Sequence, residues 1–82
     1  MDNEDNILKR VAFTAFMEAT PYLEYRDWVE ETYRVCLQRV ENHEQLKKIL
    51  EEEIKKQEDV VKRADLKIYL TYLEKVWRKS FG

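Results

Sequence analysis

Only two residues of the 82-residue chain, Pro21 and Gly82, belong to the types that most often interrupt regular secondary structure. Ordinary usage is about 7% glycine and about 5% proline, so both types are scarce here. Hairpins and β-sandwiches need such turn residues at short intervals, which excludes an all-β fold. The chain is therefore predicted to be all-α.

The composition is that of a soluble globular protein. Apolar residues make up 44% and charged residues 39% of the chain, which is too apolar for a disordered protein and too charged for a membrane protein. No apolar run approaches the ~18–20 residues that cross a bilayer, so no membrane partner is expected. Residues 1–5 are predicted to be a frayed N-terminus, and 6–82 a single helical domain.

The lone cysteine, Cys36, cannot form an internal disulfide bond. The start of the chain, MDNEDN, is acidic, whereas a secretory signal needs a basic region before an apolar one. Both features favour a reducing compartment. We therefore expect this small acidic protein, with a net charge of −2, to be cytoplasmic.

Two helices are predicted in the first half of the chain. Apolar residues recur at spacings of three and four over 6–19, which predicts the first helix. The second is predicted to run from Pro21, with Thr20 as its N-cap, to about Glu41. An alternative start lies at Asp27, where DWVE has the pattern of a capping box.

The remainder of the chain predicts one long helix. Asn42 and Gln45 have capping-box spacing, and neither glycine nor proline follows before Lys79. A 3.5-residue repeat typical of a coiled coil also crosses the region, formed by Leu50, Ile54, Gln57, Val61, Ala64 and Ile68. A helix over 43–79, about 55 Å long, would complete a bundle of three helices. The alternative is a four-helix bundle with a break near 57–60 and Asp59 as the cap.

Helical periodicity also predicts which side chains form the core. These are Leu8, Val11, Phe16, Val29, Tyr33, Cys36, Leu37, Val40, Ile68, Leu73 and Val76, while Tyr22 and Tyr25 lie on the same stripe of the second helix.

The stretch 60–81 has more apolar surface than one helix needs. Its apolar residues occupy around two-thirds of the helical circumference, whereas a surface helix needs about one-third. The first two helices carry extra apolar strips as well. The predicted interaction surface is Phe13, Met17, Trp28, Val35, Leu66, Leu70 and Trp77. A homo-oligomer, most simply a symmetric dimer, or another protein partner is expected to cover it, unless a four-helix arrangement folds these strips inside.

No residue pattern indicates catalysis or a cofactor. The chain has one histidine, His43, and one cysteine, whereas zinc sites converge three or four ligands. Cys36 lies on a core stripe, and the only glycine is the last residue, so no phosphate-binding loop exists. The protein is predicted not to be an enzyme and to need no cofactor.

Charge is unevenly distributed along the chain. Residues 60–82 hold six basic and two acidic residues, while the preceding part is acidic. The basic residues Lys62, Arg63, Lys67, Lys75, Arg78 and Lys79 are candidate contacts to nucleic-acid phosphates, with the nearby aromatic residues able to stack on bases. Basic residues near the end of a helix also suit its dipole without any ligand.

Two functions therefore follow from the residues. The first is a non-enzymatic helical module for protein–protein interaction or oligomerisation, such as a small regulator or adaptor. The alternative is a nucleic-acid-binding accessory domain that uses the basic last helix, and a third possibility is an acidic mimic of nucleic acid. Burial of Tyr69, Tyr72 and Trp77 would favour the first, and their exposure among the basic residues the second.

Overall fold

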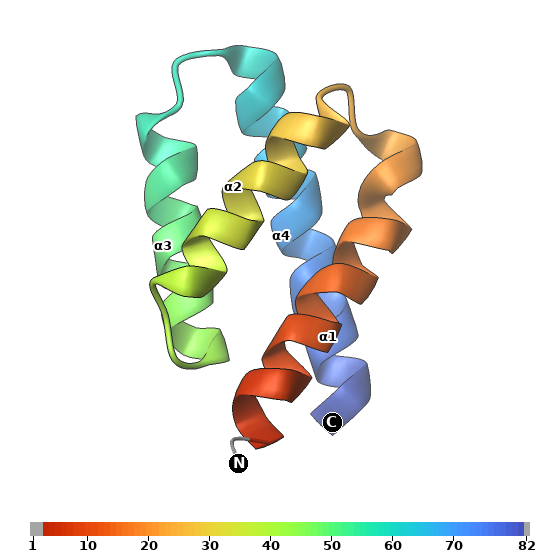
Figure 1. Ribbon diagram of the computed structural model, residues 1–82. Helices are drawn as coiled ribbons and strands as arrows, with labels where there is room; N and C mark the ends of the chain where they lie inside the picture. Colours follow the sequence, from red (N-terminus) through yellow and green to blue (C-terminus); the bar gives the residue numbers. More distant parts are fainter. Residues whose placement is uncertain (1–2, 82) are drawn as a thin grey trace.

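The computed structural model describes residues 3–81 and consists of helices joined by short connections (Figure 1). The α-helices are α1 (Asn3–Ala19), α2 (Arg26–Gln38), α3 (His43–Lys56) and α4 (Val60–Phe81), and a 3-10 turn, η1 (Thr20–Tyr22), follows α1. The predicted all-α bundle is confirmed. Helix α1 begins before the expected residue 6, and residues 1–2 of the segment expected to fray lie outside the described part.

Helix α4 lies at the centre of the bundle and contacts each of the other three helices, α1 most extensively. Its buried stripe is Leu66, Tyr69, Leu73 and Val76, with Asp65 beside it. Leu70, Tyr72 and Trp77 widen this stripe and pack against the core. Most of the wide apolar arc of 60–81 is therefore covered within one chain, by neighbours on several sides, while Val60, Val61 and Phe81 near the helix ends remain exposed.

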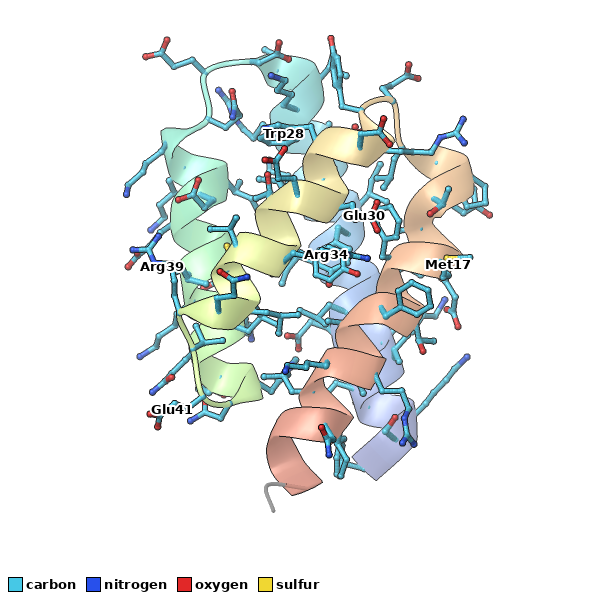
Figure 2. All side chains as sticks on the ribbon, viewed as in Figure 1. Met17, Trp28, Glu30, Arg34, Arg39 and Glu41 are labelled. Carbon is cyan, nitrogen blue, oxygen red and sulfur yellow. The ribbon has the colours of Figure 1, made fainter. Side chains whose placement is uncertain are left out.

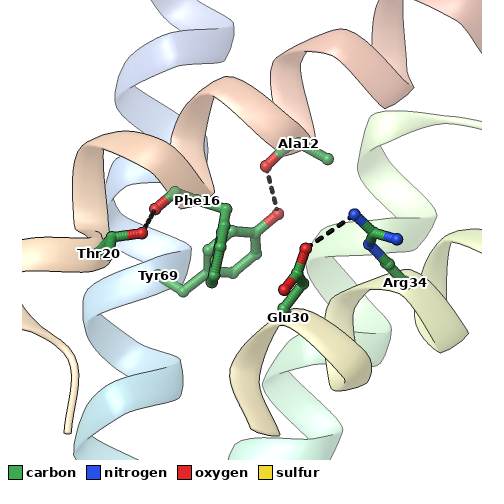
Figure 3. Close-up of polar contacts among 6 residues, drawn as sticks. All are labelled: Ala12, Phe16, Thr20, Glu30, Arg34 and Tyr69. Atoms are coloured by element: carbon green, nitrogen blue, oxygen red, sulfur yellow. Dashed lines mark hydrogen bonds and ion pairs between the residues drawn. The ribbon is translucent and has the colours of Figure 1, made fainter. Parts of the chain in front are cut away.

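Aromatic rings connect three helices inside the core. The ring of Tyr33 on α2 stacks on Tyr69 of α4 with centroids 5.1 Å apart, and its other neighbour is Phe16 of α1 at 5.6 Å. The Tyr69 hydroxyl donates a hydrogen bond of 3.0 Å to the Ala12 carbonyl (Figure 3). Burial raises the pKa of Tyr69 well above its usual value, so this hydroxyl stays a donor.

The expected continuous helix over 43–79 is wrong, and the four-helix alternative is correct. The chain leaves helical geometry at Gln57, whose φ and ψ are −71° and 121°. Asp59 then caps α4, since its Oδ1 accepts hydrogen bonds from the backbone N–H groups of Val61 and Lys62 at 2.9 and 3.0 Å. The longest dimension of the bundle is 38 Å, too short for the helix of about 55 Å that the sequence predicted.

The 3.5-residue repeat predicted a continuous helix wrongly, because only part of the repeat is buried. Leu50 is in the core, but Val61 and Ala64 of the same repeat are exposed. The buried stripe of α4 follows a different phase, starting at Leu66. Because α4 folds back beside α3, the apolar stripes of these two helices are buried against the same core. In one straight helix the two stripes would lie far apart.

The second helix begins later than predicted. Pro21 lies in η1, and Leu23 after it is extended and buried, so the chain turns before α2 starts at Arg26. The predicted capping of this helix by Thr20 is absent, because the Thr20 hydroxyl donates to the Phe16 carbonyl at 2.6 Å (Figure 3). The alternative start at Asp27 is closer, although the N-cap is Tyr25 and no side chain caps it.

The start of α3 and most of the core agree with the sequence-based predictions. The Asn42 cap is confirmed, because Asn42 Oδ1 accepts from the Gln45 backbone N–H at 2.9 Å. The Gln45 side chain departs from a capping box, because its Oε1 accepts from the Glu41 N–H at 2.8 Å and not from that of Asn42. Most of the predicted core is buried, while Leu37, Val40 and Ile68 are half-buried. Tyr22 and Tyr25 are exposed, because they precede α2 and do not lie on its inner face.

Candidate interaction surface

The predicted interaction residues divide into three groups. Leu66 is fully buried and cannot contact a partner, which corrects the prediction, because it lies on the inner stripe of α4. Trp28, Leu70 and Trp77 are half-buried and pack against the core. Phe13, Met17 and Val35 remain exposed, at 48%, 54% and 47%. The four-helix arrangement thus folds part of the extra strips inside and leaves Phe13, Met17 and Val35 outside.

Val35 is separated from the two residues on α1. It lines a shallow depression of about 330 Å³ on the other side of α2, beside Glu53 of α3. Phe13 and Met17 are four residues apart on one face of α1, so they form one exposed patch. Figure 2 shows Met17 at the outer side of α1.

A groove of about 570 Å³ adjoins this patch between α1 and the C-terminal half of α2. Its lining consists of Lys9, Phe13, Tyr33, Arg34, Leu37, Gln38 and Val40. Leu37 and Val40 were expected in the core, and their partial exposure gives the groove an apolar floor. We call the exposed patch and this groove together the α1–α2 face.

Two basic residues line the groove. Lys9 and Arg34 line it, and the lining contains no carboxylate among the residues that the structure describes. Arg34 pairs with Glu30 one turn earlier on α2, at 2.8 Å (Figure 3). The pKa of Tyr33 is raised by burial, which outweighs the lowering effect of Arg34, so its hydroxyl remains protonated and neutral.

The basic residues of α4 do not form one free array. Lys62 Nζ lies over the rings of Trp28 and Tyr25, 5.1 and 5.5 Å from their centroids. Arg63 donates from Nε to the Gln57 carbonyl at 3.0 Å. The other four candidates for phosphate contacts are exposed on the helix: Lys67, Lys75, Arg78 and Lys79.

The aromatic residues near these basic side chains make contacts within the protein. Tyr69 is buried, and the Trp77 ring stacks on His43 with centroids 4.2 Å apart. Tyr72 stacks on Tyr22 at 5.9 Å. Phe81 also lies against the Trp77 ring, with centroids 4.3 Å apart, and Lys75 Nζ lies 5.4 Å from the centroid of Tyr72. All three aromatic side chains therefore already have partners within the chain.

Both carboxylates of α4 form polar contacts that sequence reasoning missed. Asp65 is buried and accepts hydrogen bonds from the backbone N–H groups of Glu24 at 3.0 Å and Tyr25 at 2.7 Å. Glu74 Oε2 lies 3.1 Å from His43 Nε2. An acidic residue within the apolar arc was a signal for Asp65, whereas nothing in the sequence indicates a pairing across 31 residues.

The surroundings of Cys36 do not activate its thiol. Cys36 is buried, and this burial, with a smaller effect of Glu53, raises the pKa of its thiol to about 11. Such a thiol is almost entirely protonated at neutral pH and a poor nucleophile. Within residues 3–81 no three His, Cys, Asp or Glu side chains gather in a way that would hold a metal ion. No helix in this range has the length and apolar character needed to span a bilayer.

Residues 4–78 match the MJ1579 family, and the chain belongs to this family. No curated protein and no solved structure matches the chain.

Proposed function

We propose that this protein is a non-enzymatic helical module for protein–protein interaction and that it binds its partner through the α1–α2 face. The observation that carries the proposal is the pairing of an exposed apolar patch, Phe13 and Met17, with an adjoining groove whose floor is also apolar. Single exposed apolar residues are ordinary, whereas a patch continuous with a groove is typical of binding surfaces.

The burial of aromatic residues supports this function over nucleic-acid binding. Binding to single-stranded nucleic acid uses aromatic side chains as stacking platforms. Tyr69 lies in the core here, and Trp77 is stacked on His43. Nucleic-acid binding by α4 remains the second candidate function, because four basic side chains of this helix are exposed: Lys67, Lys75, Arg78 and Lys79.

Site-specific photo-crosslinking tests the proposal. A benzophenone amino acid is placed at Phe13, or at the matched exposed position Thr71 on α4, and each full-length protein is irradiated in an extract of its source cells. We expect discrete protein adducts from position 13 that the Met17→Asp substitution removes. Adducts only from position 71 would support the α4 alternative, and no adduct that depends on Met17 would contradict the proposal.

The same experiment separates a partner from self-association. An adduct with twice the 10.1 kDa mass of the chain indicates a homodimer, and any other mass indicates a different protein. We place the interaction in the cytoplasm, because a lone Cys36 suits a reducing compartment.

A further inference from the structure

We infer that the groove of the α1–α2 face accepts an amphipathic helix whose apolar stripe is flanked by acidic side chains. This inference rests on the proposed function and specifies the chemistry of the partner. It follows from the shape and charge of the groove, and it distinguishes such a helix from a second copy of this chain.

The apolar part of the groove fits side chains from one face of a helix. Binding pockets usually measure about 300–1,000 Å³, and the groove lies within this range at about 570 Å³. Helices that bind in grooves insert residues spaced by three, four and seven positions. Phe13 and Leu37 line opposite sides of the groove, and Met17 extends its apolar surface by one turn of α1.

The charged part of the groove favours an acidic ligand. Lys9 and Arg34 line the groove, and Arg10 is exposed one turn before Phe13. The salt bridge to Glu30 engages one nitrogen of the Arg34 guanidinium, which has five N–H donors in all. A carboxylate on the bound helix would meet these cations at the edge of an apolar contact, where charge complementarity selects partners.

The same charges disfavour a second copy of the chain. A two-fold interface places the same patch of both subunits against itself. Lys9, Arg10 and Arg34 belong to this patch, so the interface would hold two sets of the same cations, and like charges brought together oppose binding. The protein has a net charge of −2, so this local positive charge is not a consequence of its overall composition.

A display library tests the charge of the ligand directly. Helical peptides of 17 residues, the length of α1, carry fixed apolar residues on one stripe, and the flanking positions vary among Glu, Lys, Gln and Ser. The library is selected on the full chain, and the Phe13→Asp variant removes peptides that bind elsewhere. We expect Glu to be enriched over Lys at the flanks of the selected peptides.

A synthetic peptide of the selected sequence then measures affinity by fluorescence anisotropy. Binding should weaken by about tenfold or more in Phe13→Asp, where a charge enters an apolar contact, and several-fold in Arg34→Gln. The matched control Lys67→Gln, on the exposed face of α4, should change affinity by less than about twofold. Circular dichroism confirms that each variant remains helical.

The possible outcomes separate this inference from the proposed function. Selected peptides that depend on Phe13 but carry Lys or neutral flanks overturn the acidic ligand and leave an interaction module. Sedimentation equilibrium that shows a dimer abolished by Phe13→Asp also overturns it, because the second copy is then the occupant. If no peptide depends on Phe13 and no crosslink forms from position 13, both the inference and the function fail.

Discussion

The apolar residues of α4 are mostly covered by the rest of the chain, whereas two large apolar residues of α1 are exposed. Apolar residues cover around two-thirds of the circumference of α4, yet most are in the core or packed against it. On α1, by contrast, Phe13 and Met17 are about half exposed. The difference arises from position, because α4 contacts three helices and α1 lies at the side of the bundle.

This comparison shows how a wide apolar arc should be interpreted. In a small bundle, one central helix needs such an arc to contact several neighbours, so the width alone does not indicate a partner. An apolar residue outside the inner stripe of a peripheral helix is more informative, because no neighbour within the chain covers it. Leu66 and Phe13 illustrate the two cases.

The largest expected effect concerns the central helix. Leu73 is fully buried, and Leu73→Ala should lower the free energy of unfolding by about 2–5 kcal/mol, because a cavity remains where the side chain was. Urea denaturation followed by circular dichroism measures the loss. A loss below about 1 kcal/mol would show that α4 is not the centre of the core.

A second substitution tests the polar link between α4 and the connection after α1. Asp65→Ala removes the acceptor for the backbone N–H groups of Glu24 and Tyr25 and should cost about 2–3 kcal/mol. Asp65→Asn keeps one acceptor oxygen and should cost less. If urea denaturation shows that both variants are as stable as the unsubstituted protein, these hydrogen bonds do not stabilise the fold.

A third substitution tests the start of α3, one of the neighbours that cover α4. Asn42→Ala removes the cap to the Gln45 N–H and should cost about 0.5–2 kcal/mol. Hydrogen exchange should show faster exchange of amides in the first turn of α3. Unchanged exchange there would indicate that the Asn42 cap is not formed in solution.

The smallest effect on stability is expected on the peripheral helix. Phe13 is 48% exposed, so Phe13→Asp should change the free energy of unfolding by less than about 1 kcal/mol. Thermal denaturation beside Leu73→Ala provides the direct contrast. If the two variants lose similar stability, Phe13 belongs to the core and the exposed patch on α1 does not exist.

Local signals in the sequence predicted the helices better than their packing. The cap at Asn42 was predicted correctly because it depends on residues three positions apart. Asp59 was recognised only as an alternative cap, since the apolar repeat across it suggested continuity. That repeat crossed from one helix to the next, and only the position of α3 against α4 decides which of its residues are buried.

The candidate site was predicted in part for the same reason. Phe13 and Met17 were identified because they lie outside the inner stripe of one helix. The groove beside them was not predicted, because it depends on how α1 and α2 diverge at one end of the bundle. Contacts such as that between His43 and Glu74 join residues far apart in the chain and have no local signature.

The pairing of the first and last helices also affects when this domain can fold during synthesis. The Tyr69 hydroxyl bonds to the Ala12 carbonyl across 57 residues, and Asp65 bonds to the Tyr25 N–H across 40. Domains generally fold as units, and α1 to α3 lack their central neighbour until α4 has left the ribosome. The apolar faces of α1 to α3 therefore stay open while these helices are synthesised, and the core closes only after α4 has emerged.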